Sequence, residues 1–280
     1  MKAHEKTRQL VRKAYGEVAQ KPTPCCSGSS CCDKASKDVF NGKKGLPRRM
    51  KSLKAPIKNA APVSEGEMGL SCGNPVAFSK IKKGMTVLDL GSGAGKDVFI
   101  AAPLVGNKGK VIGVDMTPEM LKLAKDNLLK FIKRTGLSNV EFRKGIIERL
   151  PVKNAEADLI ISNCVINLSP DKPKVFREAF RVLRPGGFIV VSDIVLNREL
   201  PPSFKNHSGL YAACVAGALQ RRDYLGAIKN AGFKGVRLFS DNTYRAGGGC
   251  SDPITSKAAK ALEGAASSIT VYALKPRRSK

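Results

Sequence analysis

Short apolar runs alternate with segments of helical periodicity over the middle of the chain. Runs of this length between turn residues predict strands, and they occur at 86–90, 110–115, 140–144, 157–163 and 188–195. The run 157–163 is apolar on both alternating sets of positions, which indicates burial on both faces. Helices are predicted at 120–134, after Thr117-Pro118-Glu119, and at 172–183. This alternation predicts an α/β fold with a doubly wound, Rossmann-like and mostly parallel sheet.

The alternation is interrupted after Leu196, and different patterns flank this core. Residues 201–219 resemble an inserted helical segment, and a helix (222–231), a strand (236–239) and a terminal strand (268–274) follow it. The last strand is expected to run antiparallel. Before the core, residues 7–20 predict a short amphipathic helix, and residues 21–64 show no clear period. We therefore expect three parts, an N-terminal helix with a flexible arm (1–68), a core (69–196) and a C-terminal part that completes the sheet (197–280).

Length and composition suit a single large core. The chain has 280 residues, of which 42% are hydrophobic, and no apolar run approaches the length of a membrane span. The first 20 residues are charged throughout and lack the apolar stretch of a secretory signal. We therefore expect a protein of the reducing cytoplasm, without membrane partners and monomeric. In that compartment the eight cysteines favour thiol chemistry over a disulfide framework.

The formal net charge of +26 raises the possibility of a nucleic-acid partner. Nine Lys and Arg residues lie between Lys34 and Lys58. However, only one aromatic residue, Phe40, lies within this basic segment. Since one ring could not stack on successive bases, a solubilising basic surface is favoured over a nucleic-acid site.

A glycine-rich loop, Gly91-Ser92-Gly93-Ala94-Gly95, joins the strand 86–90 to a helix that begins near Asp97. Glycines let the chain turn tightly and let a ligand approach the backbone, and the helix start favours polar or anionic groups. Asp115 ends the next strand about 20 residues on, where a carboxylate can accept both ribose hydroxyls. A dinucleotide dehydrogenase would show the same two features.

The sequence "LDLGSGAG" is not a pyrophosphate-binding loop and resembles the first motif of S-adenosylmethionine-dependent methyltransferases. The turn "LRPGG" before the fifth strand is also typical of that family. The resemblance implies that S-adenosylmethionine is the cofactor and that the segment 201–219 is a substrate cap. It also implies a set of cofactor-binding residues, with Asp89 near the methionine amino group and Met116 on the adenine: Asp89, Gly91, Ser92, Gly93, Gly95, Asp115, Met116, Ile147, Glu148 and Asn163.

Three cysteines lie in segments that could meet at the methyl group. Cys164 follows the fourth strand, Cys72 lies in the loop "SCGNP", and Cys214 lies in the apolar run "AACVAGAL", which is predicted to be helical. Each could instead be a small buried hydrophobic residue. Converging thiols would suit a soft centre, either zinc or trivalent arsenic. Arsenic fits better beside a methyl donor, because it binds three thiolates and keeps a nucleophilic lone pair.

The motifs "CGNP", "VIGVDMTPEML", "SNCVINLSPDK" and "YAACVAGAL" closely resemble those of arsenite S-adenosylmethionine methyltransferases. The resemblance covers about residues 69–219, and it implies that Cys72, Cys164 and Cys214 bind arsenic during its methylation and detoxification. Some positions depart from the family pattern. These are Lys96, Pro103 (which should kink the first helix of the core), the segment "LQRRDYL" and the basic segment 40–61.

Four further cysteines, Cys25, Cys26, Cys31 and Cys32, flank a Gly/Ser spacer. They could form a zinc site, deliver arsenite as accessory thiols or supply electrons. The family resemblance implies that an N-terminal cysteine, here Cys32 or Cys31, forms a disulfide with Cys72. Thioredoxin or glutathione would then reduce that disulfide by exchange.

Two other functions stay open at this point. A carbon or oxygen methyltransferase for a small lipophilic molecule would have the same sheet and loop but no need for the cysteines. A basic methyltransferase that binds RNA or DNA would account for the charge. The sequence after the fourth strand, Asn163-Cys164-Val165-Ile166, opposes it, since enzymes that methylate amino groups of bases commonly carry Asn/Asp-Pro-Pro-aromatic there.

Overall fold

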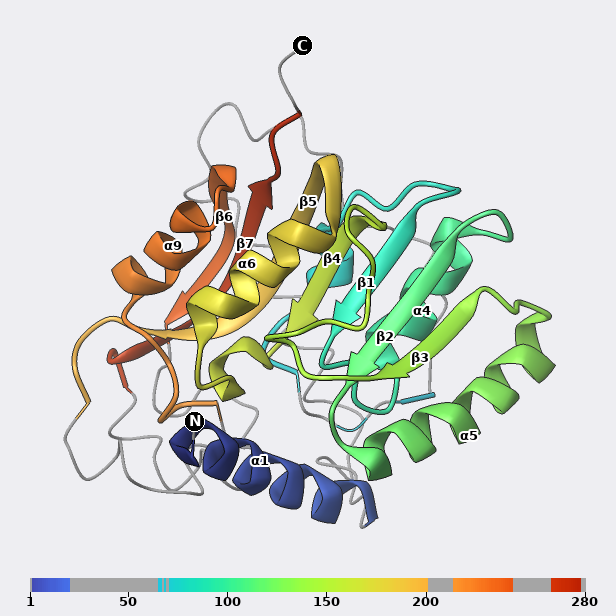
Figure 1. The fold of residues 1–280 in the computed structure, drawn as a ribbon, viewed down its shortest axis with the longest axis horizontal. Helices are drawn as coiled ribbons and strands as arrows, with labels where there is room; N and C mark the ends of the chain where they lie inside the picture. The colour runs from blue at the N-terminus through green and yellow to red at the C-terminus, as the bar shows by residue number, and fades with distance from the viewer. Residues whose placement is uncertain are drawn as a thin grey trace.

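A seven-stranded mixed sheet forms the centre of the protein (Figure 1). The structure is a computed structural model that describes residues 2–20, 65, 66, 68, 71–200, 214–243 and 263–277. The strand order is β3-β2-β1-β4-β5-β7-β6. The strands are β1 (Thr86–Leu90), β2 (Lys110–Asp115), β3 (Val140–Lys144), β4 (Ala157–Asn163), β5 (Leu183–Leu196), β6 (Lys234–Thr243) and β7 (Ala266–Leu274). Strands β1 to β5 pair in parallel, and β7 runs antiparallel to both β5 and β6. The predicted fold class is confirmed.

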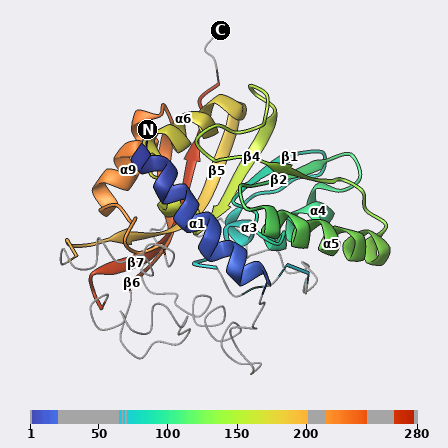
Figure 2. The same ribbon diagram turned by 60° about the horizontal axis from the view of Figure 1, so that its bottom comes forward.

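Helices pack on both faces of this sheet, as the alternating sequence pattern predicts (Figure 1). The core helices are α3 (Pro75–Phe78), α4 (Lys96–Val105), α5 (Pro118–Thr135), α6 (Lys172–Val182) and α9 (Arg221–Asn230), with the short 3-10 helix η2 (Ile166–Leu168) after β4. Helices α6 and α9 cover the face that is forward in Figure 1, whereas α4 lies behind β2. The N-terminal helix α1 (Lys2–Gln20) contacts α5 and runs past the carboxyl ends of the strands (Figure 2).

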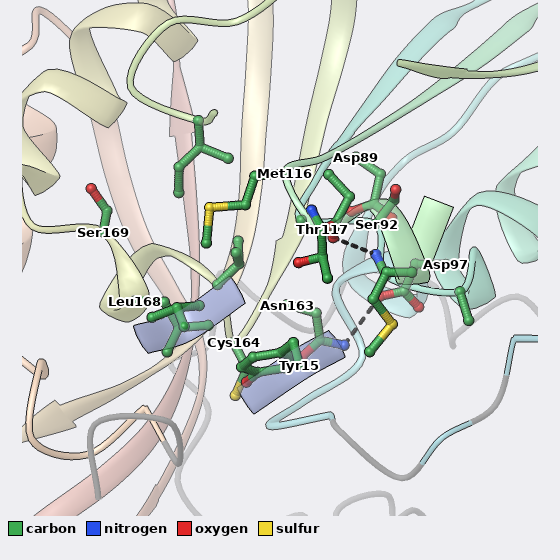
Figure 3. Close-up of a pocket in the computed structure, with 18 of the residues that line it drawn as sticks. Tyr15, Asp89, Ser92, Asp97, Met116, Thr117, Asn163, Cys164, Leu168 and Ser169 are labelled. Atoms are coloured by element: carbon green, nitrogen blue, oxygen red, sulfur yellow. Dashed lines mark hydrogen bonds between the residues drawn. The ribbon is translucent and has the colours of Figure 1, made fainter. Parts of the chain in front are cut away.

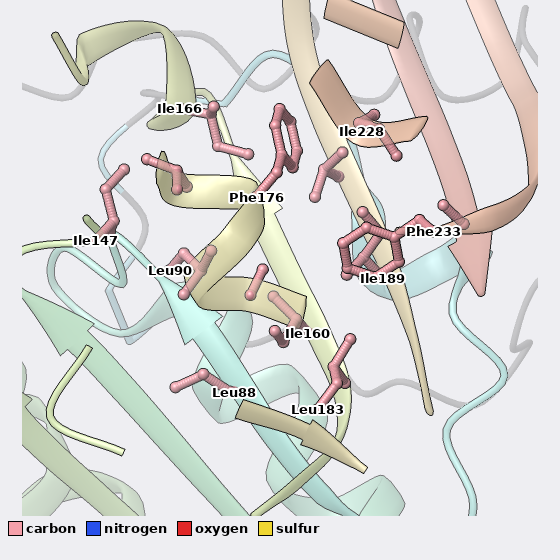
Figure 4. Close-up of a cluster of buried hydrophobic side chains, with 14 of the residues drawn as sticks. Leu88, Leu90, Ile147, Ile160, Ile166, Phe176, Leu183, Ile189, Ile228 and Phe233 are labelled. Atoms are coloured by element: carbon pink, nitrogen blue, oxygen red, sulfur yellow. The ribbon is translucent and has the colours of Figure 1, made fainter. Parts of the chain in front are cut away.

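Alternate residues of the central strands pack into two separate cores. Leu88 and Ile160 point toward α6 and α9, in the cluster that also holds Phe176 and Phe233 (Figure 4). The neighbouring positions, such as Leu159, point the other way and pack with residues of α4 and α5. This two-sided burial explains why the strands have continuous apolar sequences instead of alternating ones.

Two local predictions were wrong. The segment 184–187 is predicted as a turn, but β5 already begins at Leu183 and contains it. Gly186 lies there at φ 82°, and the pairing of β4 with β5 shifts register at this point, so the strand absorbs the extra residues as an irregularity. Residues 214–217 form turns, and residues 218 and 219 are irregular, where the sequence predicts a helix. The rest of that predicted segment, residues 201–213, lies outside the described residues.

Other features agree with the sequence or stay predictions. Helix α4 contains Pro103 and ends two residues later, so the proline affects only its last turn. Within the described ranges no helix combines the length and apolar character needed to cross a membrane. The division of the chain at residues 68 and 196 stays a prediction.

Candidate functional site

A pocket of about 130 Å³ lies at the carboxyl ends of β1, β2 and β4 (Figure 3). The strand order reverses between β1 and β4, and open α/β sheets bind ligands at such a point. The pocket wall combines the glycine loop after β1, the ends of β2 and β4, the loop before α3 and one face of α1. All ten residues predicted to bind the cofactor belong to these segments or to the loop after β3, although Gly95 does not itself line the cavity.

Glycine is required at two positions of the loop that follows β1. Gly91 has φ 67°, and a Cβ atom there would collide with the side chain of Val165. Gly95 has φ 98°, and its Cβ would lie 2.6 Å from Cε2 of Phe99. Because L side chains rarely adopt this backbone conformation, any other residue would strain the loop or push it away from the pocket. The loop is therefore shaped to bring backbone close to a ligand.

Three aspartates line the pocket, together with the basic side chains of Arg8 and Lys96. Asp89, Asp97 and Asp115 all line it, and Asp89 and Asp97 are buried. Burial raises the pKa of Asp89 well above its ordinary value, and the charges of Asp97 and Asp115 raise it further. A cationic ligand would relieve the repulsion between these carboxylates.

Asp115 is fixed by its own loop. Its Oδ2 accepts a hydrogen bond from the N–H of Gly93 at 2.9 Å, and its Oδ1 accepts one from the N–H of Thr117 at 2.8 Å. Burial raises the pKa of Asp115, and the backbone hydrogen bonds oppose that rise. The carboxylate thus ties the glycine loop to the end of β2, which is the position predicted for a ribose-binding acid.

Glu148 also lines the pocket, as do Met116 and Ile147. It is 3% exposed, and its Oε1 accepts a hydrogen bond from Oγ of Ser169 at 2.8 Å. The guanidinium of Arg8, from α1, lies 3.5 Å from the same oxygen. These partners hold the Glu148 side chain in place within the wall.

Asn163 connects the thiol loop to the cofactor side of the pocket. Its Oδ1 accepts a hydrogen bond from the N–H of Cys72 at 3.1 Å. Its Nδ2 donates to the carbonyl of Gly73 at 3.0 Å and to Oδ2 of Asp97 at 3.1 Å (Figure 3). The carbonyl of Cys72 also accepts a hydrogen bond from Oγ of Ser268, at 2.5 Å. Asn163 therefore holds a cysteine loop as well as lining the predicted cofactor pocket.

The three cysteines of the core converge, although they are 92 and 50 residues apart in sequence. Cys72 and Cys164 are paired as a disulfide, with Cα atoms 5.6 Å apart. Sγ of Cys214 donates to the carbonyl of Cys164 at 2.7 Å. Cys164 and Cys214 are buried in one apolar cluster, and Cys72 packs against it. The structure brings the three cysteines together, and it pairs Cys72 with Cys164, which was not predicted. Their role as arsenic ligands stays a prediction.

Cys164 and Cys214 both adopt left-handed backbone conformations, with φ of 59° and 62°. Among the described residues the only other non-glycine residue with positive φ is Ala155. Such a conformation costs about 1 kcal/mol or more for a residue with a side chain and is concentrated at functional sites. Two of the three convergent cysteines therefore stand where glycine would be less strained.

A buried polar cluster near Cys214 is formed by Lys172, Asp193 and Tyr224. Tyr224 donates a hydrogen bond to Oδ2 of Asp193 at 2.8 Å, and both side chains are fully buried. Burial raises the pKa of Asp193 to about 7, against the opposing effects of Tyr224 and Lys172. Lys172 donates to the carbonyl of Ser169 at 2.9 Å, and burial lowers its pKa to about 8. The opposing effect on the pKa of Lys172 comes from the charges of Asp193, Cys214 and Glu148, which raise it.

Other predicted site residues are not tested. Cys25, Cys26, Cys31 and Cys32 lie outside the described residues, as does the basic segment 34–58. Within the part of the chain that the structure describes, no three His, Cys, Asp or Glu side chains are arranged to hold a metal ion. The predicted N-terminal disulfide partner of Cys72 thus stays a prediction.

The pocket wall also contains residues that sequence reasoning missed, among them Arg8, Val11, Tyr15, Asp97 and Ser169. Asp97 lies in the first turn of α4, directly after the glycine loop. This position in the sequence could have indicated that Asp97 faces the pocket. Arg8, Val11 and Tyr15 share one face of α1 by their spacing. That spacing indicates a buried face, but it does not indicate what the face contacts.

The chain is similar to known methyltransferases in sequence and in fold. Residues 81–232 match the family described as methyltransferase domain. The arsenite methyltransferase of Halobacterium salinarum is 42% identical over 84% of this chain and 59% of that protein. That of Aquipseudomonas alcaligenes is 39% identical over 83% of this chain and 64% of that protein. The chain thus spans about three fifths of these relatives. The crystal structure of CrArsM, an arsenic(III) S-adenosylmethionine methyltransferase from Chlamydomonas reinhardtii, matches with a TM-score of 0.61 and 37% identity, over 74% of this chain and 67% of that one.

Proposed function

Because this chain belongs to the arsenite methyltransferase family, we propose that it transfers the methyl group of S-adenosylmethionine to trivalent arsenic. The observation that carries the proposal is the convergence of Cys72, Cys164 and Cys214 beside a pocket suited to a cationic nucleotide-like ligand. The left-handed backbone of Cys164 and Cys214 adds to it. A residue kept at an unfavourable φ indicates that its side chain is needed.

The lining of the pocket supports S-adenosylmethionine as its ligand. The glycines would let the backbone of their loop lie close to the ligand, and Asp115 would accept hydrogen bonds from the ribose hydroxyls. Asp89, whose pKa is raised by burial and by two neighbouring carboxylates, would hold the amino group of the methionine portion. Met116, Ile147 and Glu148 would contact the adenine. When bound, S-adenosylmethionine supplies an electrophilic methyl group on a sulfonium.

The three cysteines would hold the substrate as thiolates. Arsenite exchanges its oxygen ligands for three sulfur ligands, and the arsenic keeps a lone pair that acts as the nucleophile. No proton has to leave that nucleophile, so a general base is not required. The contribution of the protein is then mainly to position the arsenic against the methyl group.

The cycle requires a thiol reductant at two points. The Cys72–Cys164 disulfide must receive two electrons and two protons before both sulfurs can bind arsenic. Methyl transfer also formally oxidises arsenic from the trivalent to the pentavalent state, and two thiols that become a disulfide return the two electrons. We assign the second role to Cys72 together with Cys32 or Cys31, and the resetting to thioredoxin or glutathione. Methylated arsenic leaving the site would make the reaction one of detoxification.

The test is incubation of the reduced protein with arsenite, S-adenosylmethionine and glutathione, followed by speciation of the arsenic. Methylated arsenicals and an equivalent amount of S-adenosylhomocysteine are expected. Cys164→Ser and Cys214→Ser should each abolish methylation of inorganic arsenite, while Ser138→Ala, at an exposed position outside the pocket lining, serves as a control. A small-molecule carbon or oxygen methyltransferase would bind S-adenosylmethionine equally well, but it would neither bind arsenite nor depend on these cysteines.

A further inference from the structure

Helix α1 forms a wall of the active pocket. Arg8, Val11 and Tyr15 line the pocket, and their spacing of three and four residues places them on one face of the helix. Val11 is 2% exposed and belongs to the apolar cluster that holds Cys164 and Cys214. Figure 2 shows the helix crossing the end of the sheet where the strands finish.

Contacts at two points fix the helix against the core. It packs on α5, where a Cβ atom at Gly16 would lie 3.2 Å from Oε2 of Glu119. Its first half is held by the pair between Arg8 and Glu148. These contacts fix the position of Tyr15, one turn beyond Val11, relative to the cysteines.

Tyr15 reaches the third cysteine. Its hydroxyl oxygen lies 3.9 Å from Sγ of Cys214, within hydrogen-bond reach for sulfur. Its ring packs against the cluster that contains Cys164, and both side chains appear together in the close-up (Figure 3). The contact joins residues that are 199 positions apart in the chain.

The need for such a donor follows from the chemistry at Cys214. As a thiol, Cys214 donates to the carbonyl of Cys164. The thiolate that binds arsenic has no proton to donate, and the same carbonyl oxygen then repels it. Because Cys214 is only 3% exposed, little water is available to stabilise the anion. A phenol hydroxyl within reach can turn toward the sulfur and donate to it.

We propose that Tyr15 is a positioning residue, which donates a hydrogen bond to the Cys214 thiolate and holds it for arsenic binding. This inference rests on the proposed function. It makes α1 part of the substrate site and not only a cover for the cofactor. A hydrogen bond to a charged group is strong enough to change arsenite binding by about tenfold or more.

The test compares Tyr15→Phe with the wild type in reducing buffer. The KM for arsenite should rise about tenfold, with unchanged KM for S-adenosylmethionine, kcat and thermal midpoint. Tyr272→Phe, which loses a hydroxyl on β7 outside the pocket lining, should match the wild type. In a Cys214→Ala background, Tyr15→Phe should cause no further loss of equilibrium arsenite affinity, since the two residues act as a unit.

Three results would overturn the inference. Tyr15→Phe could bind and turn over arsenite like the wild type, or it could weaken S-adenosylmethionine and arsenite equally, as loss of helix packing would. It could also weaken arsenite binding as much in the Cys214→Ala background as alone. Failure of the proposed function looks different, because then wild type and Cys214→Ala bind arsenite equally weakly whatever residue stands at position 15.

Discussion

The side-chain oxygen of Asn163 accepts a hydrogen bond from the backbone N–H of Cys72 at 3.1 Å. Asn163 also donates to Asp97 at 3.1 Å, so one amide group contacts both the thiol loop and the acidic side of the pocket. The distance between the cysteines and the cofactor pocket therefore depends on a side chain that directly precedes one of those cysteines.

Asn163→Asp should lower the rate of arsenite methylation about tenfold or more. The variant keeps the acceptor for Cys72 but loses both N–H donors, and it places a new carboxylate beside Asp97. Steady-state assays at saturating S-adenosylmethionine measure the effect. Asn139→Asp is a suitable control, since Asn139 likewise donates to two backbone carbonyls, those of Ala102 and Gly106, away from the pocket. Equal rates for both variants would count against the role of Asn163.

Cys164→Gly should be more stable than Cys164→Ala, by about 1 kcal/mol, because glycine adopts positive φ without strain. Both variants should lose arsenite methylation. The free energies of unfolding from urea denaturation under reducing conditions give the comparison. At Ala155, with φ of 52° and no place in the pocket, Ala155→Gly should show the same gain in stability with full activity. An alanine variant at 164 as stable as the glycine variant would mean that the backbone there is not strained.

Affinity for S-adenosylmethionine should fall as the pH is lowered. The pKa of Asp89 is raised well above its ordinary value by burial, Asp97 and Asp115, so its carboxylate becomes protonated at a higher pH than a typical aspartate. Only the charged form attracts the amino group of the ligand. Isothermal titration calorimetry across the acidic range measures this dependence. In Asp89→Asn the affinity should be low and nearly independent of pH, and a parallel pH profile in the two proteins would refute the assignment.

Asp193 should make the protein less stable as the pH rises. Its pKa is raised by burial from 3.8 to about 7, so the folded state keeps a proton that the unfolded state has already lost. Its contribution to stability is complete below about pH 4 and is lost as the pH rises through about 7. Relative to the wild type, Asp193→Asn should therefore gain stability as the pH rises from about 4 to about 7. A difference in unfolding free energy that does not change with pH would contradict this.

Most of the core was predictable because its signals are local. The strands β1 to β5 follow from apolar runs, and the glycine loop with Asp115 follows from steric needs that any ligand approaching the backbone imposes. The position of Cys164 after β4 places it at the carboxyl end of the sheet, next to the pocket. The family resemblance then implied that Cys72 and Cys214 lie at the same site.

The errors arose where distant contacts override local preference. The run "AACVAGAL" favours a helix by composition, yet Cys214 lies in a turn at φ 62°. Its thiol contacts Cys164 and its neighbours pack in a shared apolar cluster, and these tertiary contacts fix the backbone. The role of α1 was equally hidden, because nothing in residues 8–15 indicates contact with Glu148 or Cys214.

X-ray absorption at the arsenic edge tests the central claim most directly. The protein would be reduced, loaded with one equivalent of arsenite and examined without S-adenosylmethionine. The account predicts three sulfur atoms and no oxygen around each arsenic in the wild type, and two sulfur atoms in Cys214→Ala. An arsenic centre that keeps oxygen ligands in the wild type, or the same three sulfur atoms after loss of Cys214, would contradict it.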